Sequence, residues 1–175
     1  MGFDGIWPRR YIHGPRMDKF ALTRSIISQL EAELALQTEA ALGSRDEATN
    51  EESRAEDKYD MRSQSAAYLA SGQAKLATDI AAALAAWKTL TPRAFGPGDG
   101  IAAGALVVLE AKGRKAAYLV GPHSGGLEAR DGESTATVVT GASPLGRQLL
   151  GRRVGDAVQI ADRLGPVVHQ VTSVE

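Results

Sequence analysis

Seven acidic residues gather in one short stretch of this 175-residue chain, and they are the residues best suited to chemistry. The acids are Asp46, Glu47, Glu51, Glu52, Glu56, Asp57 and Asp60. Carboxylate oxygens are the ligands that Mg²⁺ prefers in proteins, so acids grouped at an exposed position can help to hold a metal ion. A plainer interpretation stays open, because solvated acids at the start of a helix are also favoured by the helix dipole.

Two long segments with helical periodicity flank the acids and must position them. In the first, from about Asp18 to Ser44, the predicted seam is Phe20, Thr23, Ile27, Leu30, Leu34, Gln37 and Ala41. In the second, from about Ser53 to Leu90, it is Ala66, Leu69, Gln73, Leu76, Ile80, Ala83, Trp87 and Leu90. Apolar residues that alternate at spacings of three and four are typical of a coiled coil. We predict an antiparallel coiled-coil hairpin over residues 17–91, which carries the acids at the end of a slender rod.

The sequence changes character after residue 91. Prolines and glycines predict a linker over 92–100. The predicted strands that follow are 105–109, 116–120, 136–140, 157–161 and 166–174. Between the third and fourth strands, Ser143 is suited to a helix N-cap, Pro144 to the first helical position and Gly151 to the residue beyond the end. We predict an α+β protein whose residues 101–175 form a small, mostly antiparallel β domain with one short helix packed on the sheet.

Composition limits the class of protein. A net charge of −1 argues against a general nucleic-acid binder, which would be basic. Cysteine is absent, and no apolar run approaches the roughly 20 residues that span a bilayer, so we expect a cytoplasmic protein without membrane contact. Glycines and prolines interrupt any periodicity in residues 1–16, so we predict a flexible tail there. The three arginines of this segment also allow a basic arm that contacts nucleic acid. His13, His123 and His169 are too dispersed to predict a metal site.

Two segments resemble the Gre family of bacterial transcript-cleavage factors. The more specific is Ser143-Pro144-Leu145-Gly146-Arg147-Gln148-Leu149-Leu150-Gly151-Arg152-Arg153-Val154-Gly155-Asp156, which is similar to a signature of the family's C-terminal domain. The other, Ala55-Glu56-Asp57-Lys58-Tyr59-Asp60-Met61-Arg62, is similar to the acidic segment that leads through a Tyr into the family's second helix. The resemblance covers roughly residues 17–175.

The resemblance implies a fold and a function. The C-terminal domain would be FKBP-like and would dock on RNA polymerase at the mouth of its secondary channel. The coiled coil would enter the channel, where its tip acids help to hold the polymerase's second Mg²⁺ beside the nascent RNA. The chain would then be a monomeric elongation factor without a cofactor of its own: it would not be an enzyme, but would stimulate hydrolysis of backtracked RNA by the polymerase. The docking residues it implies are Ser143, Pro144, Leu145, Gly146 and Arg147.

The acids that would hold Mg²⁺ depend on the alignment with the family pattern, in which two acids are separated by two residues. Alignment through Tyr59 places Glu52 at the first acid but Ala55 at the second. A shift of one residue pairs Glu52 with Glu56, which would be neighbours on one helical face. We expect Glu52 and Glu56 to act first, and Glu51 and Asp57 after them.

Three alternatives stay open. A Gre-like inhibitor or competitor would occupy the same channel without stimulating cleavage, and the departures from the family pattern at Ala55 and Ala142 keep this in view. A prolyl isomerase would share the fold but needs a pocket lined by aromatics, and Tyr118 is the only aromatic residue after Phe95. A plain coiled-coil scaffold would leave the Ser-Pro signature unexplained. We expect Trp87 and Tyr68 to be packing residues.

Overall fold

The computed structural model describes residues 17–49, 61–96, 98–162 and 165–175. These residues form two compact units. The first, which we call the hairpin unit, is Ser28–Ala85. The second, the sheet unit, joins residues 17–27 to Ala86–Glu175, so it takes in the base of both long helices. Among the described helices, none combines the length and the apolar character that crossing a membrane requires.

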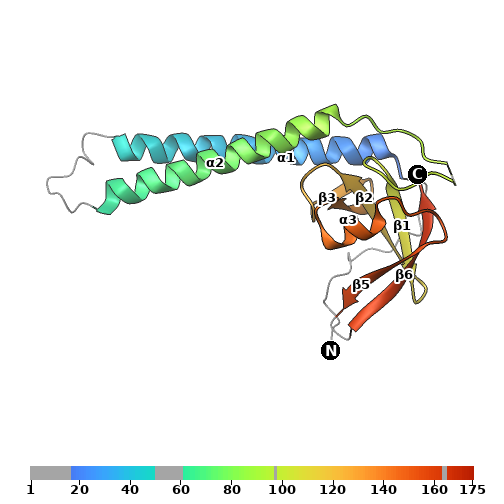
Figure 1. Ribbon diagram of the computed structural model, residues 1–175. Coiled ribbons are helices and arrows are strands. Elements are labelled where there is room, and N and C mark those ends of the chain that lie inside the picture. The colour runs from blue at the N-terminus through green and yellow to red at the C-terminus, as the bar shows by residue number, and fades with distance from the viewer. Residues whose placement is uncertain (1–16, 50–60, 97, 163–164) are drawn as a thin grey trace. The chain divides into compact units, whose positions relative to one another are not determined.

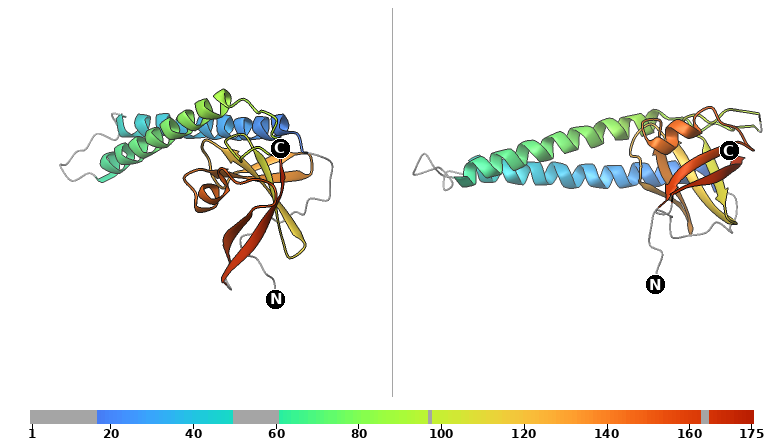
Figure 2. Two further views of the ribbon diagram at one scale, coloured as in Figure 1. Left: turned by 45° about the vertical axis from the view of Figure 1, so that its right-hand side comes forward. Right: turned by 60° about the horizontal axis from the view of Figure 1, so that its bottom comes forward.

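The hairpin unit contains most of two helices that lie side by side, α1 (Lys19–Thr49) and α2 (Met61–Thr89) (Figures 1 and 2). The predicted hairpin is therefore confirmed. Buried Leu30 on α1 and Ile80 on α2 occupy the seam, and the Ser44 hydroxyl donates to the Gln73 side-chain oxygen at 2.9 Å. Because alanine dominates α2 and carries almost no side chain, the two helices can approach closely.

The predicted seam is wrong at three positions. Leu69 and Leu76 are 53% and 44% exposed, whereas Ala70 and Ala77, one residue further on, are partly buried. The small alanines allow close contact, so the seam follows them and the leucines turn outward. Phe20 is also exposed, at 56%, and α1 instead buries Leu22 and Ile26 completely within the sheet unit.

The sheet unit contains a six-stranded sheet in the order β3-β4-β2-β1-β6-β5 (Figure 1). The strands are β1 (Leu106–Ala111), β2 (Arg114–Gly121), β3 (Glu128–Asp131), β4 (Ser134–Thr140), β5 (Ala157–Asp162) and β6 (Gly165–Val174). Strands β1 and β2 meet at Lys112-Gly113, both with positive φ, as a tight hairpin turn requires. The short helix α3 (Pro144–Leu149) follows β4, as predicted.

The sheet is mixed: four of its five strand pairs are antiparallel, as predicted, and one pair is parallel. Strands β2 and β4 run parallel, with Tyr118 opposite Thr137 and Gly121 opposite Thr140. The reason is β3, an edge strand that the sequence analysis missed. It reverses the chain before β4, and it has only four residues, of which Ala129 alone is buried. Such a short, charged segment lacks the apolar alternation by which strands are recognised.

Trp87 joins the base of α2 to the sheet. Its side chain is fully buried, as expected for a packing residue. A Cβ atom on Gly121 of β2 would lie only 2.3 Å from the Trp87 ring, so the indole rests directly on the strand backbone. The base of α1 is fastened to edge strand β3, because the Arg130 amide donates to Ser25 Oγ at 3.2 Å. The same contact satisfies a backbone donor on an otherwise open sheet edge.

Candidate partner-binding site

The acids predicted to act lie outside the described residues. Glu51, Glu52, Glu56 and Asp57 all fall within residues 50–60, so their role stays a prediction. Within the described ranges, no group of three or more His, Asp or Glu side chains is placed to hold a metal ion. The site that can be built from the structure is therefore the predicted docking segment, Ser143–Arg147.

Ser143 and Pro144 start α3 as the sequence predicts. The Ser143 backbone is extended, and its Oγ accepts from the Gly146 amide at 3.0 Å. The same hydroxyl donates to the Thr140 carbonyl at 2.8 Å, which fastens the helix start to the end of β4. Pro144 occupies the first turn, where the missing N–H costs nothing. The capping geometry accounts for both residues, whether or not a partner touches them.

Gly146 is required by close packing. A Cβ atom at this position would lie 1.9 Å from the Thr140 carbonyl oxygen, a distance that no side chain tolerates. The first turn of α3 therefore lies directly against the end of β4. This contact places Leu145, which is partly buried against the core, beside the sheet.

Arg147 lies on the exposed side of α3. Its Nη1 donates to the Ala142 carbonyl at 2.6 Å, so the side chain folds back over the loop before the helix. Arg152 reaches the Gln148 carbonyl in the same way, at 3.4 Å. These contacts orient two of the arginines that cluster in this part of the sequence, and both remain exposed.

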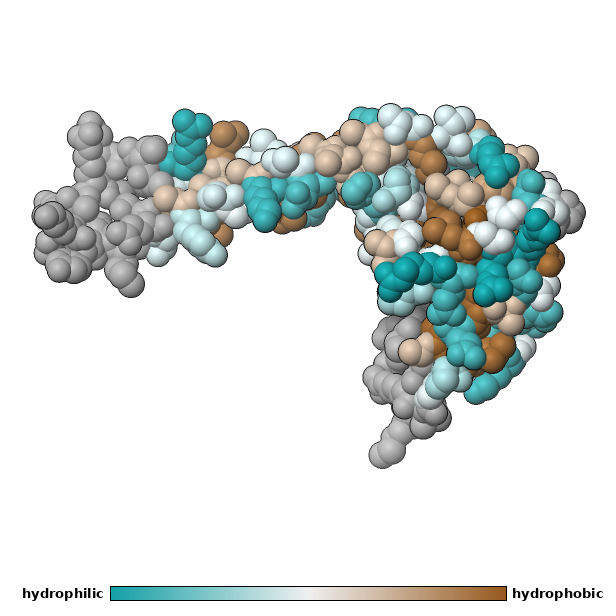
Figure 3. All heavy atoms as spheres, viewed as in Figure 1, coloured by the Kyte–Doolittle hydropathy of each residue, from teal (hydrophilic) through white to brown (hydrophobic). Residues whose placement is uncertain are grey.

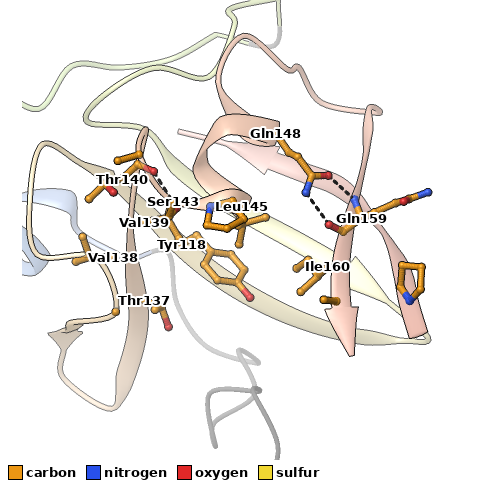
Figure 4. A pocket seen from close by; sticks show the side chains of 16 residues that line it. Tyr118, Thr137, Val138, Val139, Thr140, Ser143, Leu145, Gln148, Gln159 and Ile160 are labelled. Carbon is orange, nitrogen blue, oxygen red and sulfur yellow. Dashed lines mark hydrogen bonds between the residues drawn. The ribbon is translucent and has the colours of Figure 1, made fainter. Parts of the chain in front are cut away.

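An open groove of about 970 Å³ lies between α3 and the sheet (Figure 4). It contains three of the predicted docking residues, Ser143, Pro144 and Leu145. Strand β4 supplies Thr137–Thr140, and β5 supplies Gln159–Ala161. Figure 3 shows hydrophobic surface around α3 and β5, bordered by hydrophilic residues. The docking segment thus forms one wall of a mainly apolar depression.

Tyr118 lies in the middle of the groove, and sequence analysis did not assign it to the site. The residue is 8% exposed, and its hydroxyl points into the open space between Thr137 and Ile160 (Figure 4). Burial raises the pKa of the hydroxyl above its ordinary value of 10.0, so it stays protonated and can donate a hydrogen bond. One feature of the sequence could have pointed to this residue, because Tyr118 is the only Phe, Tyr or Trp in the six strands.

Gln148 closes the edge of β5 beside the groove. Its side-chain Nε2 donates to the Gln159 carbonyl at 2.8 Å, and its Oε1 accepts from the Gln159 amide at 2.9 Å. The amide group therefore acts as a short substitute for a neighbouring strand. The sequence analysis did not predict a role for Gln148, because its contact with Gln159 depends on the packing of α3 against β5.

Comparisons with known proteins found similar solved structures only. Neither a protein-family model nor a curated protein matches the chain. GreA factor homolog 1 (Gfh1) of Thermus thermophilus is 22% identical, with a TM-score of 0.36, over 85% of this chain and 94% of that one. Thermus aquaticus Gfh1 is 24% identical, with a TM-score of 0.37, and the match covers 91% of this chain and 96% of that protein. The prokaryotic transcription elongation factor GreA/GreB from Nitrosomonas europaea is 18% identical, with a TM-score of 0.36, and the match covers 56% of this chain and 77% of that protein.

Proposed function

We propose that this chain is a Gre-like accessory factor that binds RNA polymerase at the mouth of its secondary channel. There it stimulates hydrolysis of backtracked nascent RNA by the polymerase and is not itself an enzyme. The sheet unit docks through the segment Ser143–Arg147, and the acidic stretch of residues 46–60 acts in the polymerase active centre.

The observation that carries this proposal is the way in which the Ser-Pro signature is built. Ser143 caps α3, and Gly146 fits only because it lacks a side chain. Together they hold Pro144 and Leu145 at the wall of an open apolar groove. Such a rigid, exposed feature suits a docking element. A pair of long helices joined by an acid-rich stretch is the second feature in its support.

The acids contribute oxygen ligands. Glu52 and Glu56 are the residues that would hold the polymerase's second Mg²⁺, followed by Glu51 and Asp57. When bound, a second divalent ion stabilises the attacking and leaving oxygens of phosphodiester hydrolysis. One or two carboxylates suit Mg²⁺, which usually keeps several waters and takes few protein ligands.

The test is cleavage of RNA in a purified backtracked polymerase complex. The double variant Glu52→Ala, Glu56→Ala should lose the stimulation of cleavage and still bind polymerase. The matched control is Glu39→Ala, Asp79→Ala, which removes two exposed helix acids outside the acidic stretch and should cleave normally. Loss of binding in the first variant would contradict the division between docking and chemistry.

A secondary-channel inhibitor is the second candidate, and one observation favours it. Ala142 precedes the Ser-Pro pair, where the family can carry an acid, and its carbonyl is occupied by Arg147. The same assay separates the two functions. If the unaltered chain leaves the RNA at full length and slows nucleotide addition, the inhibitor is the correct function.

A further inference from the structure

The stretch that contains α3 and the turns after it carries positive charge without any acid. Residues 142–155 include no Asp or Glu but three exposed arginines, Arg147, Arg152 and Arg153. Among the described residues, none of their guanidinium groups forms an ion pair. The side chains of Arg147 and Arg152 donate to the backbone carbonyls of Ala142 and Gln148, which carry no net charge. The three positive charges are therefore left for solvent or for a partner.

Other basic side chains of the sheet unit lie beside an acid. Arg93 Nη1 is 3.6 Å from Asp99 Oδ2, and Arg130 Nη2 is 3.8 Å from Glu128 Oε2. In each of these pairs the two opposite charges largely cancel one another at a distance. Around the three arginines they do not, so this stretch projects a positive field that attracts anionic groups.

The backbone that carries the arginines is held by hydrogen bonds. The Gly151 amide donates to the Ile101 carbonyl at 2.8 Å, and the Ile101 amide donates to the Arg152 carbonyl at 2.8 Å. The Arg153 amide donates to Asp156 Oδ2 at 2.9 Å, so the carboxylate nearest in the sequence is engaged with the backbone. A partner meets a backbone that is already ordered, and binding then costs less conformational entropy than it would for a free loop.

Two exposed aliphatic side chains lie among the arginines in the sequence. Leu150 is 44% exposed and Val154 is 43% exposed. A phosphate backbone gains little from such groups, and proteins that bind single-stranded nucleic acid use aromatic side chains, of which residues 142–155 have none. Protein interfaces, by contrast, are enriched in arginine and bury apolar groups at their core. The mixture therefore favours an acidic protein surface over a nucleic acid.

We infer that an acidic segment of a partner protein binds to a surface, here called the arginine patch, made of Arg147, Leu150, Arg152, Arg153 and Val154. Carboxylates of the segment pair with the guanidinium groups, whose forked N–H donors match a carboxylate, and an apolar residue of the segment covers the two aliphatic side chains. The inference rests on the proposed function and deepens it. The partner is RNA polymerase, and its surface opposite the arginine patch is acidic.

The test measures binding of the fluorescently labelled full chain to purified RNA polymerase by anisotropy, at about 50 and about 200 mM salt. The double variant Arg152→Glu, Arg153→Glu reverses two charges outside the docking segment and keeps the backbone hydrogen bonds of both residues. It should bind about tenfold more weakly at the lower salt concentration, because repulsion replaces attraction to the carboxylates. Its affinity should also depend less on salt than that of the unaltered chain. Arg152→Lys, Arg153→Lys keeps the charge and should bind within about threefold of the unaltered chain.

The matched control is Lys112→Glu, Lys115→Glu, which makes the same change in net charge at the exposed turn between β1 and β2. It should bind polymerase like the unaltered chain. Arg153→Glu alone should weaken binding by about threefold, and its side chain makes no hydrogen bond to a described residue, so it tests the same point with little risk to folding. Circular dichroism reports that each variant is folded.

The outcomes separate this inference from the proposed function. If the patch variants bind like the unaltered chain, or are weakened no more than the control, the inference is overturned and the proposed function stands. If the unaltered chain does not bind polymerase, both are overturned. A labelled single-stranded oligonucleotide is tested in parallel. If it binds the unaltered chain and not the double variant, the arginine patch is a site for phosphate groups and the inference is overturned.

Discussion

The two units differ in how completely they bury their side chains. Every large side chain that the structure shows as fully buried belongs to the sheet unit, including Trp87, Leu22, Ile26 and Leu109. In the hairpin unit, the described seam residues keep 7–9% exposure at best, and several leucines face outward. Burial of apolar area is the main stabilising term in folding, so most of the stability must reside in the sheet unit. The outer faces of the hairpin are correspondingly free from packing constraints.

The largest expected effect is a difference in unfolding free energy between one substitution in the sheet unit and one in the hairpin unit. Trp87→Ala should lower the free energy of unfolding by about 3–5 kcal/mol, because it empties a closed site against Gly121. Leu76→Ala, at a 44% exposed position on α2, should change it by no more than about 0.5 kcal/mol. Urea unfolding followed by circular dichroism measures both. Similar losses in the two variants would show that the hairpin unit contributes as much as the sheet unit.

The same contrast explains which parts of the fold could be predicted. Helical periodicity located both long helices and most of the seam, including Leu30 and Ile80. It failed at Leu69 and Leu76, because periodicity ranks residues by hydrophobicity whereas close helix contact favours the smaller Ala70 and Ala77. At Trp87, where burial is complete, hydrophobic size and position agree, although at the start of α1 the prediction chose Phe20 and the structure buries Leu22 and Ile26. Along the outer part of α2, where burial is partial, the larger residue is not the more buried one, and the predicted seam is displaced by one residue.

The candidate site divides in a similar way. The capped start of α3 could be predicted because Ser143 and Pro144 act on residues within one turn of chain. The groove could not, because Tyr118 and Ile160 come from strands that are brought together by long-range pairing. The parallel contact of β2 with β4, which places Tyr118 opposite Thr137, depended on an edge strand that carries almost no sequence signal. The sequence therefore predicts the local cap of α3, but it does not predict the groove, which depends on long-range strand pairing.

A smaller effect tests the capped helix within the sheet unit. Ser143→Ala removes the acceptor of the Gly146 amide and the donor to Thr140, and should cost about 1 kcal/mol of unfolding free energy. Ser143→Thr keeps a hydroxyl in place and should recover most of that loss. Thermal unfolding of the three proteins gives the comparison. If both variants were equally destabilised, the hydroxyl would not be the group that fastens α3 to β4.

The smallest expected effect is a dependence of stability on alkaline pH. The pKa of Tyr118 is raised by burial in the folded chain, so the unfolded chain loses this proton at lower pH. The contribution of Tyr118 to stability should therefore be constant below about pH 10, the ordinary value for tyrosine, and should fall as the pH rises from there toward the higher folded pKa. Tyr118→Phe should make this fall shallower. Tyr68→Phe should not, because a hydroxyl at an 85% exposed position remains in water in both states. Urea midpoints measured between pH 9 and about 11 test this expectation: equal slopes in both variants would show that burial of the Tyr118 side chain does not couple its ionisation to unfolding.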